Sequence, residues 1–321
     1  MAMDLDKMVE KCERGQWNVN SFDWAQKPIP LSKEKELQVC QYYTDMSYIE
    51  RLAGALFLAL SQRVEDPRLK RIFELCHADE VRHSIAAAKL ADYFNVHNYK
   101  FYTPNLWMLQ FIPSFVKAVK TINPAFATSF ILGGELILDI ALLRGLNEYV
   151  DDPLSREVVE RINQDESRHI AMDFYMTEYF SRNRGKRASD DKTPGWLKPE
   201  FWGMLAWGPG FFNDVFFRPM QIVDPGNHQM KEVMKRLRRF NDREEVKNNP
   251  TVKNFKETVE FFESPVGSAI GTVLEKAIHL TTGIDFSFVR AASTENMKGL
   301  KEAQWTSADG TEANIRNWAT A

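Results

Sequence analysis

Long apolar stretches alternate with short polar turn signals over the first 180 residues, and this pattern predicts helices. The first helix is expected to begin at Ser32, a good helix cap, and to run to about Arg63. Its small, apolar middle, Leu52 to Leu60, predicts burial on most sides. An acidic cap followed by proline, Asp66-Pro67, predicts the start of a second helix that ends near Asn95.

The same arrangement returns further along the chain. A third helix is predicted over about 125–149, and Asp152-Pro153 predicts a fourth that continues to about Phe180. Between the two pairs lies the apolar and aromatic stretch 105–122, interrupted by Pro113, which we interpret as a crossover connection. Short turns within each pair predict antiparallel helix hairpins. The pattern therefore predicts an all-α fold with a four-helix bundle core.

The remaining segments flank this core. Trp17, Phe22 and Trp24 stand among polar residues and Pro in a stretch expected to form an irregular arm on the bundle. An aromatic stretch, 201–217, is broken by Gly208-Pro209-Gly210 and is predicted to be a packing layer or subunit contact, or less simply a channel lining. The expected organisation is an arm over 1–31, the bundle over 32–181, a linker over 182–199 and additional helices over 200–321, including amphipathic helices 227–246 and 252–280 and an irregular tail from Thr294.

One five-residue pattern, Asp-Glu-x-Arg-His, occurs twice, at 79–83 and at 165–169. Glu and His three residues apart share one face of a helix, so both can reach the same metal ion. Glu50 lies 30 residues before Glu80, and Glu135 lies 31 residues before Glu166, with a turn signal midway in each gap. Folding each segment into a hairpin brings these glutamates level with the motifs.

The two hairpins would then collect four carboxylates and two imidazoles at one depth of the core. Iron and manganese accept these ligands, whereas unpaired buried carboxylates are very costly. The sequence therefore predicts a dinuclear metal site. Its candidate ligands are Glu50, Glu80, His83, Glu135, Glu166 and His169.

The other charged residues of the motifs are candidates for supporting roles. A metal-bound His usually donates its second ring N–H to a carboxylate, so Asp79 and Asp165 are each expected to orient the His of the opposite motif. Arg82 and Arg168 would hold these Asp groups, although plain surface ion pairs are the alternative.

Three further polar residues lie at helical spacing from the candidate ligands. Asp139 follows Glu135 by four residues and is a candidate catalytic proton relay, or else an Asp that reaches solvent or pairs with Arg144. Asp173 has a weaker case of the same kind, and His77 is expected to be a surface or satisfied core histidine.

Composition narrows the function classes. The 321 residues include 44% hydrophobic and 26% charged residues, which is typical of a globular protein with a substantial core. A formal charge of −3 and the lack of a basic stretch argue against nucleic-acid binding. The three cysteines form no metal-binding or disulfide pattern, and no membrane span or signal region is evident, so we expect a cytoplasmic protein.

With its paired motifs and upstream glutamates, the segment 33–180 resembles the ferritin-like di-iron carboxylate superfamily, specifically its oxygen-activating branch. The resemblance is greatest to the p-aminobenzoate N-oxygenase group and to relatives of the ribonucleotide reductase small subunit. No branch signature is complete. Ala87 stands where the reductase subunit has a Tyr, and Ile162 stands where the N-oxygenases have an extra ligand His.

The resemblance implies a non-haem di-iron oxygenase, a monooxygenase or oxidase, that activates O2 with two iron ions or a manganese–iron pair. The expected reaction is N-oxygenation, hydroxylation or a related oxidation of a small organic substrate with a hydrophobic or aromatic part. No flavin, nicotinamide or iron–sulfur motif is visible, so a separate ferredoxin or reductase, or the substrate, would supply electrons. A radical-generating or desaturase-like protein and a ferritin-type iron-binding protein remain alternatives, and a homodimer remains open.

Overall fold

The computed structural model describes residues 3–121, 124–182, 197–226, 228–229, 232–233, 235 and 264–282. Within these residues the chain is helical and has no strand, which confirms the predicted all-α class. The longer helices are α1 (Leu5–Arg14), α2 (Lys33–Ser61), α3 (Pro67–Phe94), α4 (Leu106–Thr121), α5 (Pro124–Leu136), α7 (Pro153–Arg182), α8 (Pro199–Phe211) and α13 (Pro265–Thr282). Shorter helices are α6 (Arg144–Val150), α9 (Arg218–Val223) and a 3-10 turn, Val19–Ser21.

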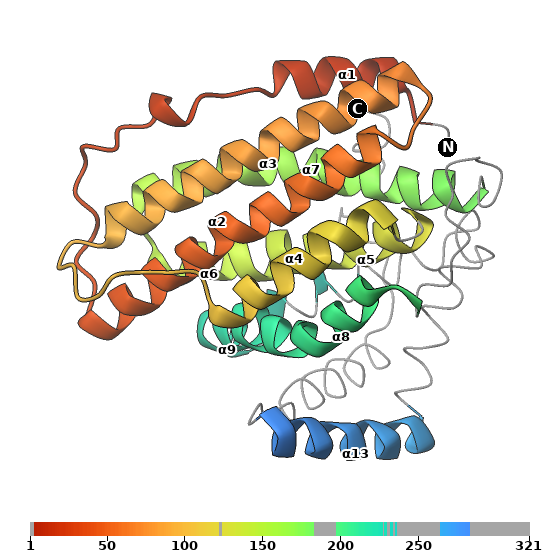
Figure 1. Ribbon diagram of the computed structural model, residues 1–321. Coiled ribbons are helices and arrows are strands. Elements are labelled where there is room, and N and C mark those ends of the chain that lie inside the picture. Colours follow the sequence, from red (N-terminus) through yellow and green to blue (C-terminus); the bar gives the residue numbers. More distant parts are fainter. Residues whose placement is uncertain are drawn as a thin grey trace.

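The two predicted helix pairs are both present (Figure 1). α2 packs along α3, α5 packs against α7, and α3 also contacts α7. The helices begin at the positions that their cap residues predicted. The Ser32 hydroxyl accepts a hydrogen bond from the Lys35 amide at 3.3 Å, and the Asp66 carboxylate accepts one from the Arg68 amide at 2.9 Å. Asp152 accepts from the Ser155 amide at 2.9 Å, directly before Pro153. Local capping chemistry thus sets the register of the helices that carry the motifs.

The N-terminal arm is more ordered than its sequence suggested. Residues 5–14 form α1, so the prediction of an irregular lead-in over 1–31 is wrong for this part. Leu5, Met8 and Cys12 recur at helical spacing and are buried where α1 packs against α3, and Asp4 caps the helix. The apolar stripe is only three residues long, and packing on α3 is what stabilises so short a helix.

The third predicted helix is continuous but not uniformly α-helical. α5 is followed by a π-helical segment, Ile137–Leu143, and then by α6. The π segment begins directly after the end of α5, two residues beyond Glu135. Such widened turns are rare and often occur at functional sites.

Neither Pro113 nor Gly208-Pro209-Gly210 ends a helix, so the predicted interruptions are wrong. Pro113 lies inside α4, and α8 continues through Pro209 into a π segment, Phe212–Phe217, and then α9. α8 therefore continues through Pro209 although proline cannot donate a backbone hydrogen bond. α8 packs on α4, where Phe211 stacks on Phe111 with ring centroids 4.4 Å apart, so the aromatic stretch is a packing layer.

Much of the C-terminal region lies outside the described residues. This holds for 183–196 of the predicted linker, for most of the predicted helix 227–246, for 252–263 and for the tail from Thr294. The predicted helix 252–280 contains most of α13, which is drawn apart from the helices of the site in Figure 1. None of the described helices is long and apolar enough to cross a membrane.

The described core consists of two apolar clusters. One contains Leu52, Leu90 and Ile162, and the other contains Leu56, Phe73 and Met176. On α2 the change from one cluster to the other falls between Leu52 and Leu56, close after Glu50. A buried polar layer therefore lies near the junction of the two clusters.

Candidate metal centre

Each of the six candidate ligands is buried, and four helices supply them. α3 carries Glu80 and His83, and α7 carries Glu166 and His169, on faces set by their three-residue spacing. Glu50 of α2 is fully buried and Glu135 of α5 is 5% exposed. The hairpin register that the sequence predicted thus brings all four glutamates to one level.

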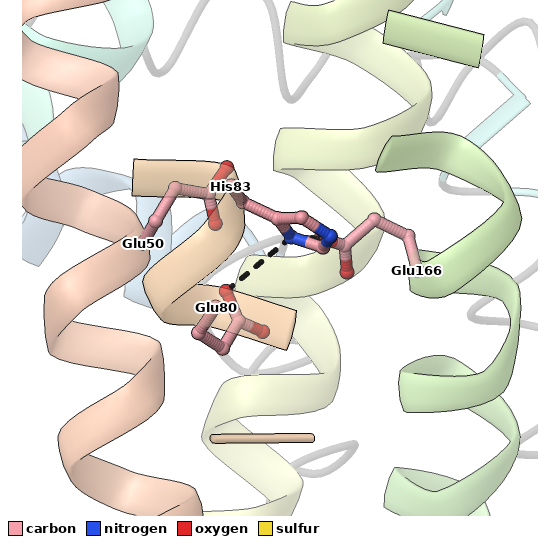
Figure 2. Close-up of side chains that lie close together, drawn as sticks. All are labelled: Glu50, Glu80, His83 and Glu166. Atoms are coloured by element: carbon pink, nitrogen blue, oxygen red, sulfur yellow. Dashed lines mark ion pairs between the residues drawn. The ribbon is translucent and has the colours of Figure 1, made fainter. Parts of the chain in front are cut away.

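The ligand atoms form two overlapping groups. Glu50, Glu80, His83 and Glu166 offer oxygen and nitrogen atoms that all lie within 4.8 Å of one another. Glu80, Glu135, Glu166 and His169 form a second group by the same measure. Figure 2 shows the first group, in which side chains from α2, α3 and α7 point toward a common centre. Glu80 and Glu166 belong to both groups.

The two shared glutamates face both histidines. The His83 Nδ1 atom lies 3.0 Å from Glu166 Oε1 and 3.7 Å from Glu80 Oε2. The His169 Nδ1 atom lies 2.9 Å from Glu80 Oε1 and 3.2 Å from Glu166 Oε2. Each shared carboxylate therefore directs one oxygen to each half of the site, as a group that bridges two cations would.

Several of these atoms have no hydrogen-bond partner within the described part of the chain. They include both carboxylate oxygens of Glu50 and of Glu80, Glu166 Oε1 and His83 Nδ1. Buried polar atoms are otherwise almost always satisfied, and an unpaired buried carboxylate is especially costly. Two divalent cations would balance the charge of four carboxylates and occupy these atoms, so the residues fit a metal pair.

The pKa shifts show the same excess of negative charge. Burial, together with the charges of Glu80 and Glu166, raises the pKa of Glu50 well above its usual value, and the same causes raise the pKa of Glu135. Burial opposes the charged form of His83, but the hydrogen bond with Asp165 and the nearby carboxylates of Glu166 and Glu80 together outweigh it and raise the pKa of this imidazole. The site stabilises cations and disfavours further anions.

The predicted cross-pairing of the two motifs is observed. His83 Nε2 donates to Asp165 Oδ2 at 3.0 Å, and His169 Nε2 donates to Asp79 Oδ2 at 3.2 Å. These contacts leave Nδ1 of each ring facing the glutamates. Burial opposes the charge of Asp79, but the hydrogen bond with His169 and the positive charges nearby together outweigh it and lower its pKa to about 2.

Both motif arginines bind the aspartates, also as predicted. Arg168 donates to Asp165 at 2.6 Å and to Asp79 at 3.3 Å. Arg82 pairs with Asp79 and lies 3.6 Å from Asp165. Their side chains are only 12% and 13% exposed, so the alternative of plain surface ion pairs does not apply. The four charges hold both imidazole rings in place.

Sequence reasoning missed two residues of the arm that complete this network. Gln16 donates to Asp79 at 2.8 Å and accepts from Arg82 at 2.7 Å. Trp17 donates its indole N–H to Asp165 at 2.7 Å and stacks beside His83, with ring centroids 6.3 Å apart. Nothing in the local sequence marks them, because their partners lie 63 and 148 residues away.

The remaining candidates have different outcomes. The side chain of Asp139, the predicted catalytic residue, is outside the described residues, although its backbone belongs to the π segment beyond Glu135. His77 Nδ1 lies 2.9 Å from the Gly54 carbonyl, so it is a satisfied core histidine. Asp173 is 1% exposed and its carboxylate has no hydrogen-bond partner in the described structure.

Comparison with protein-family models, with curated proteins and with solved structures found no match to this chain. The geometry of the site therefore carries the functional argument.

Proposed function

We propose that this protein is a non-haem di-iron oxygenase or oxidase with a ferritin-like four-helix core formed by α2, α3, α5 and α7. Two iron ions, or a manganese–iron pair, would be bound by the six candidate ligands. The metals would supply O2 activation, and the product would be an oxidised small organic compound. The sequence resemblance and the residues of the site support this proposal.

The observation that carries the proposal is the overlap of the two ligand groups at Glu80 and Glu166. A single-metal site needs no such sharing, whereas a metal pair is held by carboxylates that reach both ions. Glu50 and His83 complete one half and Glu135 and His169 the other. The two halves have the same ligand types, in agreement with the internal repeat.

The chain's own residues provide orientation, charge balance and exclusion of water. Asp79 and Asp165 fix the ring orientation of His169 and His83, so that each Nδ1 faces the metal positions. Apolar clusters around the site exclude water and favour a substrate with a hydrophobic or aromatic part. Electrons would come from a separate ferredoxin or reductase, or from the substrate.

Anaerobic titration with Fe(II) followed by exposure to O2 tests this proposal. We expect two iron ions per chain and rapid oxygen uptake that the metal-free protein lacks. Glu166→Gln removes a ligand of both halves and should reduce bound iron from two to below one. Glu160→Gln makes the same charge change at an exposed position of α7 and should keep both ions.

Binding of fewer than two ions by the wild-type chain, or no oxygen uptake by the loaded chain, would contradict the proposal. The alternatives give different results in the same samples. A ferritin-type protein would accumulate many iron ions in a large assembly. A radical-generating subunit would show a stable organic radical by electron paramagnetic resonance.

A further inference from the structure

Two buried cysteines lie beside the candidate metal centre, and the proposed reaction does not use them. Cys12 of α1 and Cys76 of α3 are both 0% exposed and belong to the same apolar cluster. The Gln16 side-chain amide donates both to the Cys12 carbonyl and to the Asp79 carboxylate, each at 2.8 Å. Cys76 precedes Asp79 by one helical turn, so this bridge places Cys12 beside the turn that carries Cys76.

The electrostatics agree with this placement. The neighbouring Cys76 thiol lowers the pKa of Cys12, and the neighbouring Cys12 thiol raises the pKa of Cys76. His169 is also a neighbour of Cys76. The thiol pair therefore lies next to a candidate metal ligand, on the side of the site that α1 covers.

We propose that Cys12 and Cys76 form a redox-active pair that is oxidised to a disulfide when the metal-loaded centre meets O2. This inference rests on the proposed function. The two S–H bonds break, an S–S bond forms, and the thiols lose two electrons and two protons. Dioxygen takes up both and becomes hydrogen peroxide, so no further reductant is needed.

The disulfide would have two consequences. It would let the chain reduce one O2 to hydrogen peroxide in the absence of an external donor. It would also join α1 covalently to α3, and thereby fix the arm that positions Gln16 and Trp17 on the aspartates of the site. Full burial would protect the pair from direct reaction with solvent oxidants.

Cys40 provides a control within the same chain. It is also 0% exposed, but it lies in the other apolar cluster. Burial raises its pKa to about 11, so it is a poor nucleophile. It should remain a thiol under every condition that oxidises the pair.

The test uses the full chain, reduced and freed of metal, then loaded anaerobically with Fe(II) and exposed to O2. Samples are denatured with an alkylating agent, and the thiols are mapped by peptide mass spectrometry. We expect roughly tenfold more Cys12–Cys76 disulfide in the iron-loaded protein than in metal-free protein kept in air, because the centre acts on an adjacent pair. Cys40 should be alkylated in both.

Cys12→Ser should abolish the disulfide while iron still binds, and Cys40→Ser should leave it unchanged. Three alkylated cysteines after measured oxygen uptake would overturn this inference and leave the proposed function standing. Equal disulfide in metal-free protein would overturn the role of the metals. Failure to bind iron would overturn both proposals.

Discussion

At the scale of single residues, the arm and the motifs form two hydrogen-bonded chains. Trp17 contacts Asp165, which contacts His83, and Gln16 contacts Asp79, which contacts His169. Each aspartate thus receives one donor from the arm and one from a candidate metal ligand. Groups that hold a ligand in this way commonly change metal affinity when they are removed.

Replacement of Trp17 by Phe tests this arrangement. The variant keeps an aromatic ring beside His83 but loses the indole N–H that donates to Asp165. We expect iron affinity to fall roughly tenfold to a hundredfold, because the orientation of His83 is less constrained. Anaerobic calorimetry or competition with a chelator measures this change.

Trp24→Phe is the matched control. It removes an indole N–H of the same arm, which donates instead to the Val19 carbonyl at 2.8 Å. Iron affinity should remain within a few-fold of the wild type. An equal loss of iron affinity in Trp17→Phe and Trp24→Phe would show that the arm acts through general packing and not through Asp165.

At the scale of helices, the close approach of α2 and α3 places Glu50 against the first motif. Gly54 is at the closest point: a Cβ atom there would lie 3.1 Å from Glu80 Cβ and 3.2 Å from His77 Nδ1. The Gly54 carbonyl also contacts His77. Glycine is favoured here because a Cβ atom would require the Glu80 and His77 side chains to shift by a few tenths of an ångström.

Gly54→Ala should therefore destabilise the protein, although the same change stabilises most helices. We expect the free energy of unfolding to fall by about 1–2 kcal/mol, because Glu80 Cβ is fixed to the backbone and cannot rotate away. The shift of α3 should also weaken iron binding. Denaturant unfolding and metal titration measure the two effects.

Gly134→Ala in α5 provides the contrast, since a Cβ atom there meets no other atom within 4 Å. This variant should be neutral or more stable by up to about 1 kcal/mol. Stabilisation of both variants would contradict the explanation given for Gly54.

At the scale of the whole molecule, the fold surrounds a layer of buried charge with apolar residues. The layer includes four glutamates, two aspartates, two histidines and two arginines, all described above. Burial raises the pKa of Glu50 and Glu135, so the metal-free protein carries an electrostatic cost that bound cations would remove. Stability and metal content should therefore be linked.

Metal removal should lower the thermal midpoint measured by calorimetry. At a free metal concentration of about 100 times the Kd, binding contributes roughly 3 kcal/mol per site.

Glu50→Gln should have opposite effects on the stability of the metal-free protein and on the stability gained by binding iron, both measured at pH 8. Its metal-free form should be more stable than the metal-free wild type, because one buried carboxylate is lost, and its gain on iron binding should be smaller. A chelator without effect on the wild type would contradict this linkage.

Sequence spacing predicted the part of the fold that depends on local rules. α2, α3 and α7 begin directly after the caps Ser32, Asp66 and Asp152, and capping depends on neighbouring residues. The continuity of α8 through Pro209 was not predictable in this way. It depends on packing against α4, where Phe211 meets Phe111.

By itself, the sequence determined the helix pairs, the level of the six candidate ligands and the cross-pairing of the two motifs. Helical periodicity and short turns are enough for the helix pairs and the ligand levels, because these relations join residues at fixed spacing along a helix or across a short turn. The cross-pairing joins residues 82 and 90 positions apart, and it was predicted from the usual carboxylate partner of a metal-bound His in two repeated motifs. Only the tertiary structure decided that α1 covers the site and that Gln16, Trp17 and Cys12 contact the motif helices. Those contacts join distant segments through shape and hydrogen bonding, which leave no periodic signal in the chain.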